Sequence, residues 1–220
     1  MTIEMNELKD SVLKSGTSIV GIVCKDGIVI GGDRRSTAGN IVMSKKSEKV
    51  VKINDFIVVA GCGVASDIDL SQRIFAAELK LKELKSKSRP TVMEAANLLG
   101  MMAYRSIRTP SMIASIVGML IGGYNEDGSF ELYTVEPAGG VYKVDDYDAN
   151  FSSGMPYIMG LLERQWKKDV NINEGVELAV EALKASTQRD TASGNGIDVF
   201  TITKDGIKQA VSQEIIPTYK

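Results

Sequence analysis

Histidine is absent from this chain of 220 residues, and its absence removes several common catalytic centres. Without an imidazole, the chain cannot build a Ser-His-Asp triad, a Cys-His pair, or a zinc or iron site held by histidine. If the protein is a hydrolase, another group must accept the proton of its nucleophile.

The balanced charge, the short apolar stretches and the two cysteines exclude further classes of protein. Basic residues number 26 and acidic residues 28, so we expect no broad positive surface for nucleic acid or an anionic membrane. The apolar stretch SMIASIVGMLIGG, from Ser111, is too short to span a bilayer, and the polar start MTIEMNELKD does not have the layout of a signal peptide. Cys24 and Cys62 lie in apolar, strand-like runs, where buried reduced thiols are common. We expect a soluble, cytoplasmic protein.

The first half of the chain reads as strands followed by two helices. Residues 18–32 predict a hairpin that turns at the Asp-Gly step of 25–27, and further strands are expected at 49–53 and 56–63. Apolar residues then recur at intervals of three and four, which predicts a long amphipathic helix. Its apolar stripe would be Leu70, Ile74, Ala77, Leu81 and Leu84. A second helix is expected after Pro90.

The second half repeats this order. A block of strands covers about 113–144 with a turn at 126–128, helices are expected at 156–168 and 174–187, and a last strand pair turns at 204–206. Helices that are segregated from strands indicate an α+β sandwich, with antiparallel sheets inside and helices outside. No linker, repeat or low-complexity segment supports a second domain.

Polar residues that interrupt the apolar strands carry the functional signal. Gly16-Thr17 precedes the first strand, Asp33 ends the second, and Lys49 begins the next. Taken singly, Asp33 and Lys49 could form a salt bridge of little value, and Thr17 could be an ordinary strand residue. Their order together with GCGVASD, SSGMP and QRDTASG makes a specific pattern.

This joint pattern resembles the proteasome β-type subunits, and the archaeal kind most closely, over about residues 16–211. The resemblance implies the fold of N-terminal nucleophile hydrolases, a four-layer αββα sandwich of two antiparallel sheets flanked by helices. It also implies that residues 1–16 are a propeptide, removed by autolysis between Gly16 and Thr17, which would leave one domain over 17–220. No metal or organic cofactor is demanded by this mechanism.

The resemblance assigns catalytic roles residue by residue. Thr17 would be the nucleophile, and its freed α-amino group, with an unperturbed pKa of roughly 8, would be the base. Lys49 would place a positive charge beside the hydroxyl, and Asp33 would hold Lys49 charged and oriented. The backbone N–H of Gly63 would face the oxyanion. Supporting polar groups would come from Ser153, Asp190 and Ser193.

Two details near this set carry separate expectations. The family's usual Gly-Ser-Gly is Ser152-Ser153-Gly154 here, so the additional Ser152 side chain could crowd the site. Arg35 would lie beside the site, whereas Arg34 would be a solvated surface charge.

The family spacing also predicts a pocket for the P1 side chain, the one that precedes the bond to be cut. Gly61 would leave this pocket roomy, and Asp69 near its base would favour a basic side chain. Asp69 could equally be a first-turn acid that stabilises a helix dipole. The expected lining is Ser36, Ser47, Val51, Gly61, Ala65 and Asp69.

Several functional interpretations stay open. A threonine endopeptidase would work inside stacked heptameric rings of α and β subunits, on unfolded proteins supplied by a separate ATP-dependent unfoldase. Alternatively, the chain is a structural β subunit that keeps its propeptide, or that needs a sister β subunit for maturation. A third interpretation is the bacterial two-ring relative of the proteasome, although the Arg34-Arg35 pair and QRDTASG favour the proteasome proper. An unrelated α+β domain with a chance motif set is the remote alternative.

Overall fold

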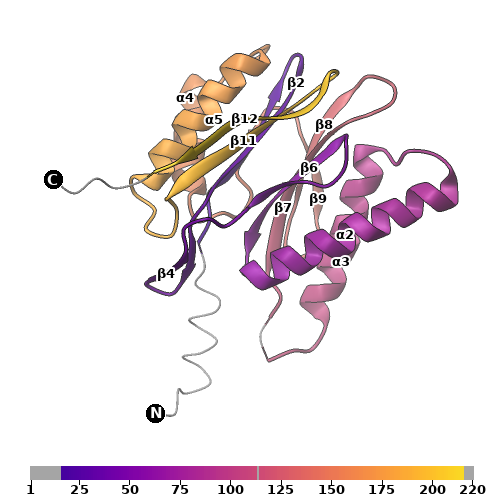
Figure 1. The fold of residues 1–220 in the computed structure, drawn as a ribbon, viewed down its shortest axis with the longest axis horizontal. Helices are drawn as coiled ribbons and strands as arrows, with labels where there is room; N and C mark the ends of the chain where they lie inside the picture. Colours follow the sequence, from indigo (N-terminus) through magenta and orange to yellow (C-terminus); the bar gives the residue numbers. More distant parts are fainter. Residues whose placement is uncertain (1–15, 113, 216–220) are drawn as a thin grey trace.

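The computed structural model of the chain describes residues 16–112 and 114–215. Two five-stranded antiparallel sheets lie face to face, and a pair of helices covers the outer face of each sheet (Figure 1). The predicted four-layer αββα sandwich is confirmed. Residues 1–15 of the expected propeptide lie outside the described residues.

The first sheet joins the N-terminal hairpin to the C-terminal hairpin. Its strand order is β10-β1-β2-β11-β12, and all neighbours are antiparallel. Both hairpins turn at the predicted Asp-Gly steps. The strands are β1 (Ile19–Cys24), β2 (Gly27–Asp33), β11 (Gly196–Thr203), β12 (Gly206–Glu214) and the short β10 (Tyr147–Asp148).

The second sheet runs in chain order, β5-β6-β7-β8-β9, again with antiparallel neighbours. Its strands are β5 (Val50–Lys52), β6 (Ile57–Gly63), β7 (Val117–Tyr124), β8 (Phe130–Val135) and β9 (Val141–Val144). An additional two-stranded hairpin that the sequence did not predict, β3 (Ser36–Ala38) and β4 (Ile41–Ser44), projects from the sandwich (Figure 1).

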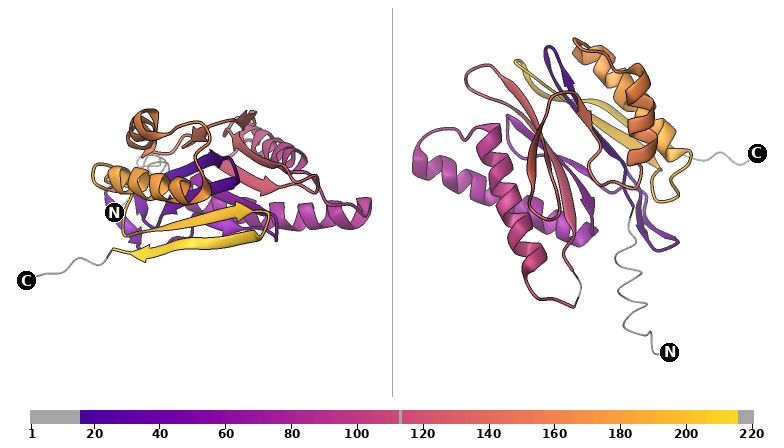
Figure 2. Two further views of the ribbon diagram at one scale, coloured as in Figure 1. Left: turned by 90° about the horizontal axis from the view of Figure 1, so that it is seen from above. Right: turned by 180° about the vertical axis from the view of Figure 1, so that it is seen from behind.

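Four helices form the outer layers. The pair α2 (Ala65–Ser86) and α3 (Val92–Arg108) covers the second sheet, and the pair α4 (Met155–Gln165) and α5 (Ile172–Thr187) covers the first. Figure 2 shows the two pairs on opposite sides of the sheets. In the described part of the chain, none of the helices combines the length and hydropathy needed to cross a bilayer.

Two of the helices begin at capping boxes. Thr91 accepts from the backbone of Glu94 while the Glu94 side chain accepts from the backbone of Thr91, and Asn171 and Glu174 repeat the arrangement at α5. Each cap contributes about 1 kcal/mol, because it satisfies N–H groups that have no partner inside the helix.

A hydrophobic core lies between the two sheets. It is built from aliphatic side chains that point inward from both sheets: Ile19, Ile28, Ile30, Val58, Ala60, Leu120 and Leu132. All seven are inaccessible to solvent. These side chains join the two sheets into one core.

Helix α2 is present as predicted, but the apolar face assigned to the core is wrong. Ile68, Gln72, Phe75 and Leu79 are the buried side chains of α2. The predicted stripe is instead exposed, with large side chains between 42% and 64% accessible: Leu70, Ile74, Leu81 and Leu84. Both stripes have helical spacing, so periodicity alone could not choose between them.

Candidate active site

Thr17 lies immediately before β1 and is buried, with 4% of its surface exposed. Its backbone N–H donates to Ser153 Oγ at 2.9 Å, and its carbonyl accepts from the backbone N–H of Gly154 at 3.2 Å. Its hydroxyl donates to the carbonyl oxygen of Gly16 at 2.8 Å. The nucleophile predicted from the sequence therefore sits directly beside the peptide bond that precedes it.

Asp33 is the last residue of β2, and its buried carboxylate accepts four hydrogen bonds. Oδ1 accepts from the backbone N–H of Ser18 at 2.8 Å and from the Lys49 ammonium at 2.6 Å. Oδ2 accepts from the backbone N–H groups of Arg35 and Gly194, each at 2.8 Å. Asp33 thus fixes the start of β1 and the loop before β11 relative to Lys49.

Lys49 connects this carboxylate to the peptide bond before Thr17. Its side chain is 6% exposed, and Nζ donates to the Gly16 carbonyl oxygen at 3.3 Å as well as to Asp33. Burial lowers the pKa of the Lys49 ammonium, and the charge of Asp33 acts in the opposite direction. The Gly16 carbonyl oxygen consequently accepts two hydrogen bonds, from Lys49 and from the Thr17 hydroxyl, which polarise it.

The predicted supporting groups form a hydrogen-bonded chain behind the Thr17 nitrogen. Ser153 Oγ accepts from that nitrogen and donates to Asp190 Oδ2 at 2.6 Å. Ser193 Oγ donates to the same carboxylate oxygen, also at 2.6 Å, and lies 2.7 Å from Ser18 Oγ. The structure therefore brings Ser153, Asp190 and Ser193 together at Thr17.

The additional serine of this sequence does not crowd Thr17. Ser152 is 5% exposed, and its hydroxyl donates to the carbonyl oxygen of Ala149 at 2.7 Å. The crowded position is instead Gly154, where a Cβ would collide with the hydroxyls of Ser18 and Ser186.

Gly63 ends β6 and has a backbone conformation that favours glycine. Its φ is +124°, and a Cβ there would collide with the carbonyl oxygen of Ile116. The backbone can follow this path only without a side chain, and it thereby forms part of the wall of the cavity beside Thr17.

That cavity has a volume of about 250 Å³. Of the six residues predicted for the P1 pocket, five line it: Ser36, Ser47, Val51, Ala65 and Asp69. Gly61 is not part of the lining, because Ile68 lies there; a Cβ on Gly61 would be 2.6 Å from Ile68 Cγ2. Sequence reasoning missed Glu48 and Gln72, which also line the cavity. Gln72 gave no usable signal, because the stripe that contains it was not the one assigned to the core.

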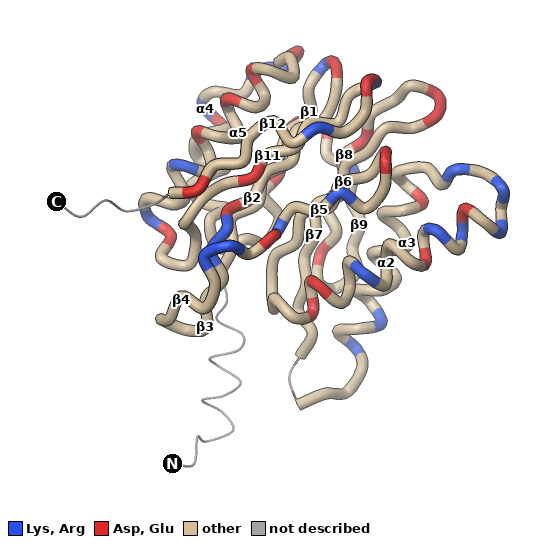
Figure 3. Tube along the Cα trace, viewed as in Figure 1, with Lys and Arg blue, Asp and Glu red and all other residues tan. Residues whose placement is uncertain are grey.

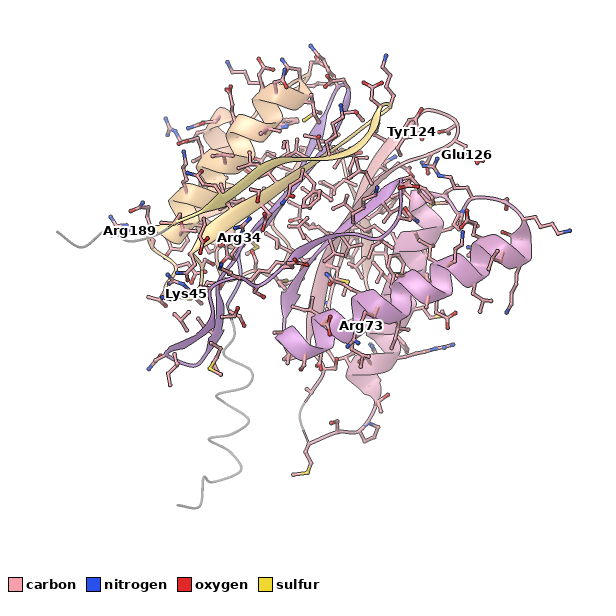
Figure 4. All side chains as sticks on the ribbon, viewed as in Figure 1. Arg34, Lys45, Arg73, Tyr124, Glu126 and Arg189 are labelled. Carbon is pink, nitrogen blue, oxygen red and sulfur yellow. The ribbon has the colours of Figure 1, made fainter. Side chains whose placement is uncertain are left out.

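Asp69 already has a partner for its charge. Its carboxylate lies 2.7 Å from Nη2 of Arg73, one turn along α2, and both side chains are about two-thirds exposed. Figure 4 labels Arg73 on this helix. A preference of the pocket for basic side chains therefore depends on a charge that is shared with Arg73, and it stays a prediction.

The two adjacent arginines have different environments, and the expectation of a solvated Arg34 is wrong. Arg34, labelled in Figure 4, makes two hydrogen bonds to the carboxylate of Asp198, at 2.8 and 2.5 Å. Its side chain is only 17% exposed. The hydrogen bond to Asp198 raises the pKa of the guanidinium. Arg35 donates to Asn195 Oδ1 and to the Thr191 carbonyl, each at 2.8 Å, and so ties down the loop that carries Asp190.

Charge is otherwise mixed over the surface. Figure 3 shows basic and acidic residues interspersed along the outer helices. Within residues 16–112 and 114–215, no group of three or more Cys, Asp or Glu side chains is placed to hold a metal ion.

Comparisons with known proteins show which family the chain is similar to. A family model described as proteasome subunit matches residues 13–202. The chain is 36% identical to the proteasome subunit beta of Nanoarchaeum equitans over 193 residues, which cover 88% of this chain and 96% of that protein. It is also 36% identical to the proteasome subunit beta of Archaeoglobus profundus over 211 residues, 96% of this chain and 95% of the relative. Proteasome subunit beta 1 of Thermococcus kodakarensis is 36% identical over 200 residues, 91% of this chain and 95% of the relative.

Proposed function

Because the chain belongs to the proteasome subunits, and among them to the β subunits, we propose that it cuts peptide bonds with Thr17 as an N-terminal nucleophile. The observation that carries this proposal is the buried cluster of Thr17, Lys49 and Asp33 at the polarised carbonyl of Gly16. Membership of this family supports protease activity. The cluster is the reason for proposing that a threonine is the nucleophile.

The first proposed reaction is self-cleavage. Thr17 Oγ attacks the carbonyl carbon of Gly16, the bond from that carbon to the Thr17 nitrogen breaks, and the hydroxyl proton ends on the nitrogen. Water then hydrolyses the resulting ester, which leaves a carboxyl group on Gly16 and restores the hydroxyl. The hydrogen bond from Lys49 to the Gly16 oxygen supports this step, because it withdraws electrons from the carbon that is attacked, and the hydrogen bond of the Thr17 hydroxyl to the same oxygen holds Oγ beside that carbon.

The second proposed reaction is hydrolysis of substrate. The freed α-amino group of Thr17, with an unperturbed pKa of roughly 8, accepts the hydroxyl proton as Oγ attacks the substrate carbonyl. The same proton then passes to the leaving amine, and water releases the acyl group from Oγ. Thr17 therefore provides both the nucleophile and the base, so the reaction needs no histidine.

The surrounding residues have separate roles in the proposal. Lys49, held by Asp33, places its charge where the hydroxyl oxygen becomes negative. Ser153 and Asp190, with Ser193 behind them, orient the amine. Gly63, in the cavity wall, presents its backbone N–H to the oxyanion.

The chain assembles with other subunits into the proteasome core, as its family implies. We propose that it does so as one of seven β subunits in a ring stacked on α rings, in the cytoplasm, with unfolded protein delivered by an ATP-dependent unfoldase. Exposed apolar side chains support extensive subunit contacts. They include the α2 stripe of Leu70, Ile74, Leu81 and Leu84, and Ile41 and Met43 of the β4 hairpin, which are 66% and 67% exposed.

The proposal is tested by co-assembly of the chain with α subunits and assay of fluorogenic peptides. Wild-type particles should hydrolyse peptides and be labelled at Thr17 by a peptide vinyl sulfone, as mapped by mass spectrometry. Thr17→Ser should retain activity and Thr17→Ala should abolish it. Equal hydrolysis by Thr17→Ala particles would contradict the assignment, and intact particles with no activity would favour a structural β subunit.

A further inference from the structure

Gln72 is a polar side chain at an apolar position of α2. Ile68, Phe75 and Leu79 share its buried stripe and pack against the second sheet. Gln72 itself is 7% exposed, and its Nε2 is fully buried with no hydrogen-bond partner among the described residues. An unpaired buried amide is costly, so its presence needs a reason other than core packing.

The same side chain lines the cavity beside Thr17. Ala65, Ile68, Asp69 and Gln72 recur at intervals of three and four along α2, so they form one face of the helix, and all four line the cavity. Gly61 of β6 allows this face to approach closely, because a Cβ there would lie 2.6 Å from Ile68 Cγ2 and 3.6 Å from Gln72 Nε2. Gln72 thus lines the cavity with an amide whose nitrogen has no partner among the described residues; that nitrogen is itself buried against Gly61, so it meets a ligand in the cavity when the Gln72 side chain turns.

We propose that Gln72 is a specificity-determining residue, which hydrogen-bonds the end of the P1 side chain and favours a long side chain with a terminal neutral amide, that of glutamine. This inference rests on the function proposed above. Each amide carries a donor and an acceptor, so two amides can pair whichever way the Gln72 group is turned.

Other P1 side chains pair less completely with the Gln72 amide. An acidic side chain meets the carboxylates of Glu48 and Asp69 in the lining. A basic side chain can pair with the carboxylates of Glu48 and Asp69, but it has only donors and therefore leaves the Gln72 nitrogen without an acceptor. An apolar side chain of the same length, methionine, fills the space but leaves the Gln72 amide unpaired.

The test compares matched substrates and a matched variant in the assembled particle. We would measure kcat/KM for four tetrapeptide reporters that differ only at P1, with Gln, Met, Arg or Glu. Wild type should prefer Gln to Met by about three- to tenfold, the range of a neutral hydrogen bond in an otherwise unpaired site. Gln72→Met, which keeps the side-chain length, should bring this ratio to one or below.

Controls separate selectivity from folding. Glu78→Gln changes an exposed residue of the same helix and should leave the Gln-to-Met ratio unchanged. Gln72→Met should melt at or above the wild-type temperature, because it removes an unpaired buried amide, and Gln72→Leu should change the ratio in the same direction. Hydrolysis with the same ratio in wild type and both Gln72 variants would overturn the inference alone. Failure of wild type to hydrolyse any reporter would overturn the proposed function, and the inference with it.

Discussion

The Lys49 ammonium and the Asp33 carboxylate lie 2.6 Å apart, and their side chains are 6% and 0% exposed. A buried pair of this kind contributes little net stability when intact, but removal of one partner leaves the other charge buried and uncompensated. The pair therefore links the fold of the chain to the chemistry at Thr17.

Asp33→Asn is expected to destabilise the chain by about 3 to 5 kcal/mol, because Lys49 keeps its burial and loses its counter-charge. Urea unfolding followed by circular dichroism measures this loss. The matched control is Asp69→Asn, which breaks an ion pair whose side chains are 66% and 70% exposed and should cost under about 1 kcal/mol. Equal losses from both variants would show that the Asp33 pair is not special.

Ser153→Ala should lower kcat/KM for peptide hydrolysis by about ten- to a hundredfold, since a hydrogen bond to the amine of Thr17 is lost. The neighbouring Ser152→Ala is the control, because the Ser152 hydroxyl binds the Ala149 carbonyl rather than Thr17. Steady-state assays of assembled particles should show Ser152→Ala near the wild-type value. A larger effect from Ser152 than from Ser153 would reverse the assignment.

Gly63→Ala is expected to cost about 2 to 6 kcal/mol, because a positive φ and a collision with the Ile116 carbonyl oxygen act together. Gly128→Ala measures the cost of a positive φ alone. The φ of Gly128 is +89°, but no atom lies within 4 Å of the added Cβ. That control should cost about 1 to 2 kcal/mol. Thermal unfolding of the two variants provides the comparison, and similar losses would exclude the steric contribution.

Both thiols should be unreactive in the folded chain. Burial raises the pKa of Cys24 and of Cys62 to about 12, from an ordinary value of 9.0. Titration with a chromogenic disulfide at pH 8 should therefore detect no thiols in the native protein and two after denaturation. Rapid native reaction at either cysteine would contradict the buried environment.

The same shifts fix the direction of a pH effect on stability. Between pH 9 and about 12, the unfolded chain releases thiol protons that the folded chain retains, so the free energy of unfolding should fall as the pH rises. Replacing both cysteines by alanine should make this alkaline decline shallower. A decline of unchanged steepness would show that other groups cause it.

Much of the fold could be predicted from the sequence because its signals are local. Asp-Gly steps at 26–27, 127–128 and 205–206 set three hairpin turns, and helical periodicity located the four helices. The buried face of α2 could not be predicted from local sequence, because two apolar stripes have helical spacing. Contact with the second sheet selects the stripe that contains Ile68 and Phe75. The β3–β4 hairpin was missed because its strands are only three and four residues long.

The site required more than local patterns. Thr17 and Ser153 are separated by 136 positions and meet only because β1 and the turn before α4 lie together in the fold. The family resemblance supplied that pairing, which no periodicity could show. The partner of Arg34 was missed for the same reason, since Asp198 comes from β11, 164 positions away.

The central claim is that Thr17 becomes the first residue of the working chain. Its most direct test is the intact mass and N-terminal sequence of the subunit, taken from particles assembled with α subunits and with any sister β subunit. We predict a chain that begins at Thr17 in wild type and one that still begins at Met1 in Thr17→Ala. A wild-type chain that begins at Met1 within particles that hydrolyse peptides would contradict the account.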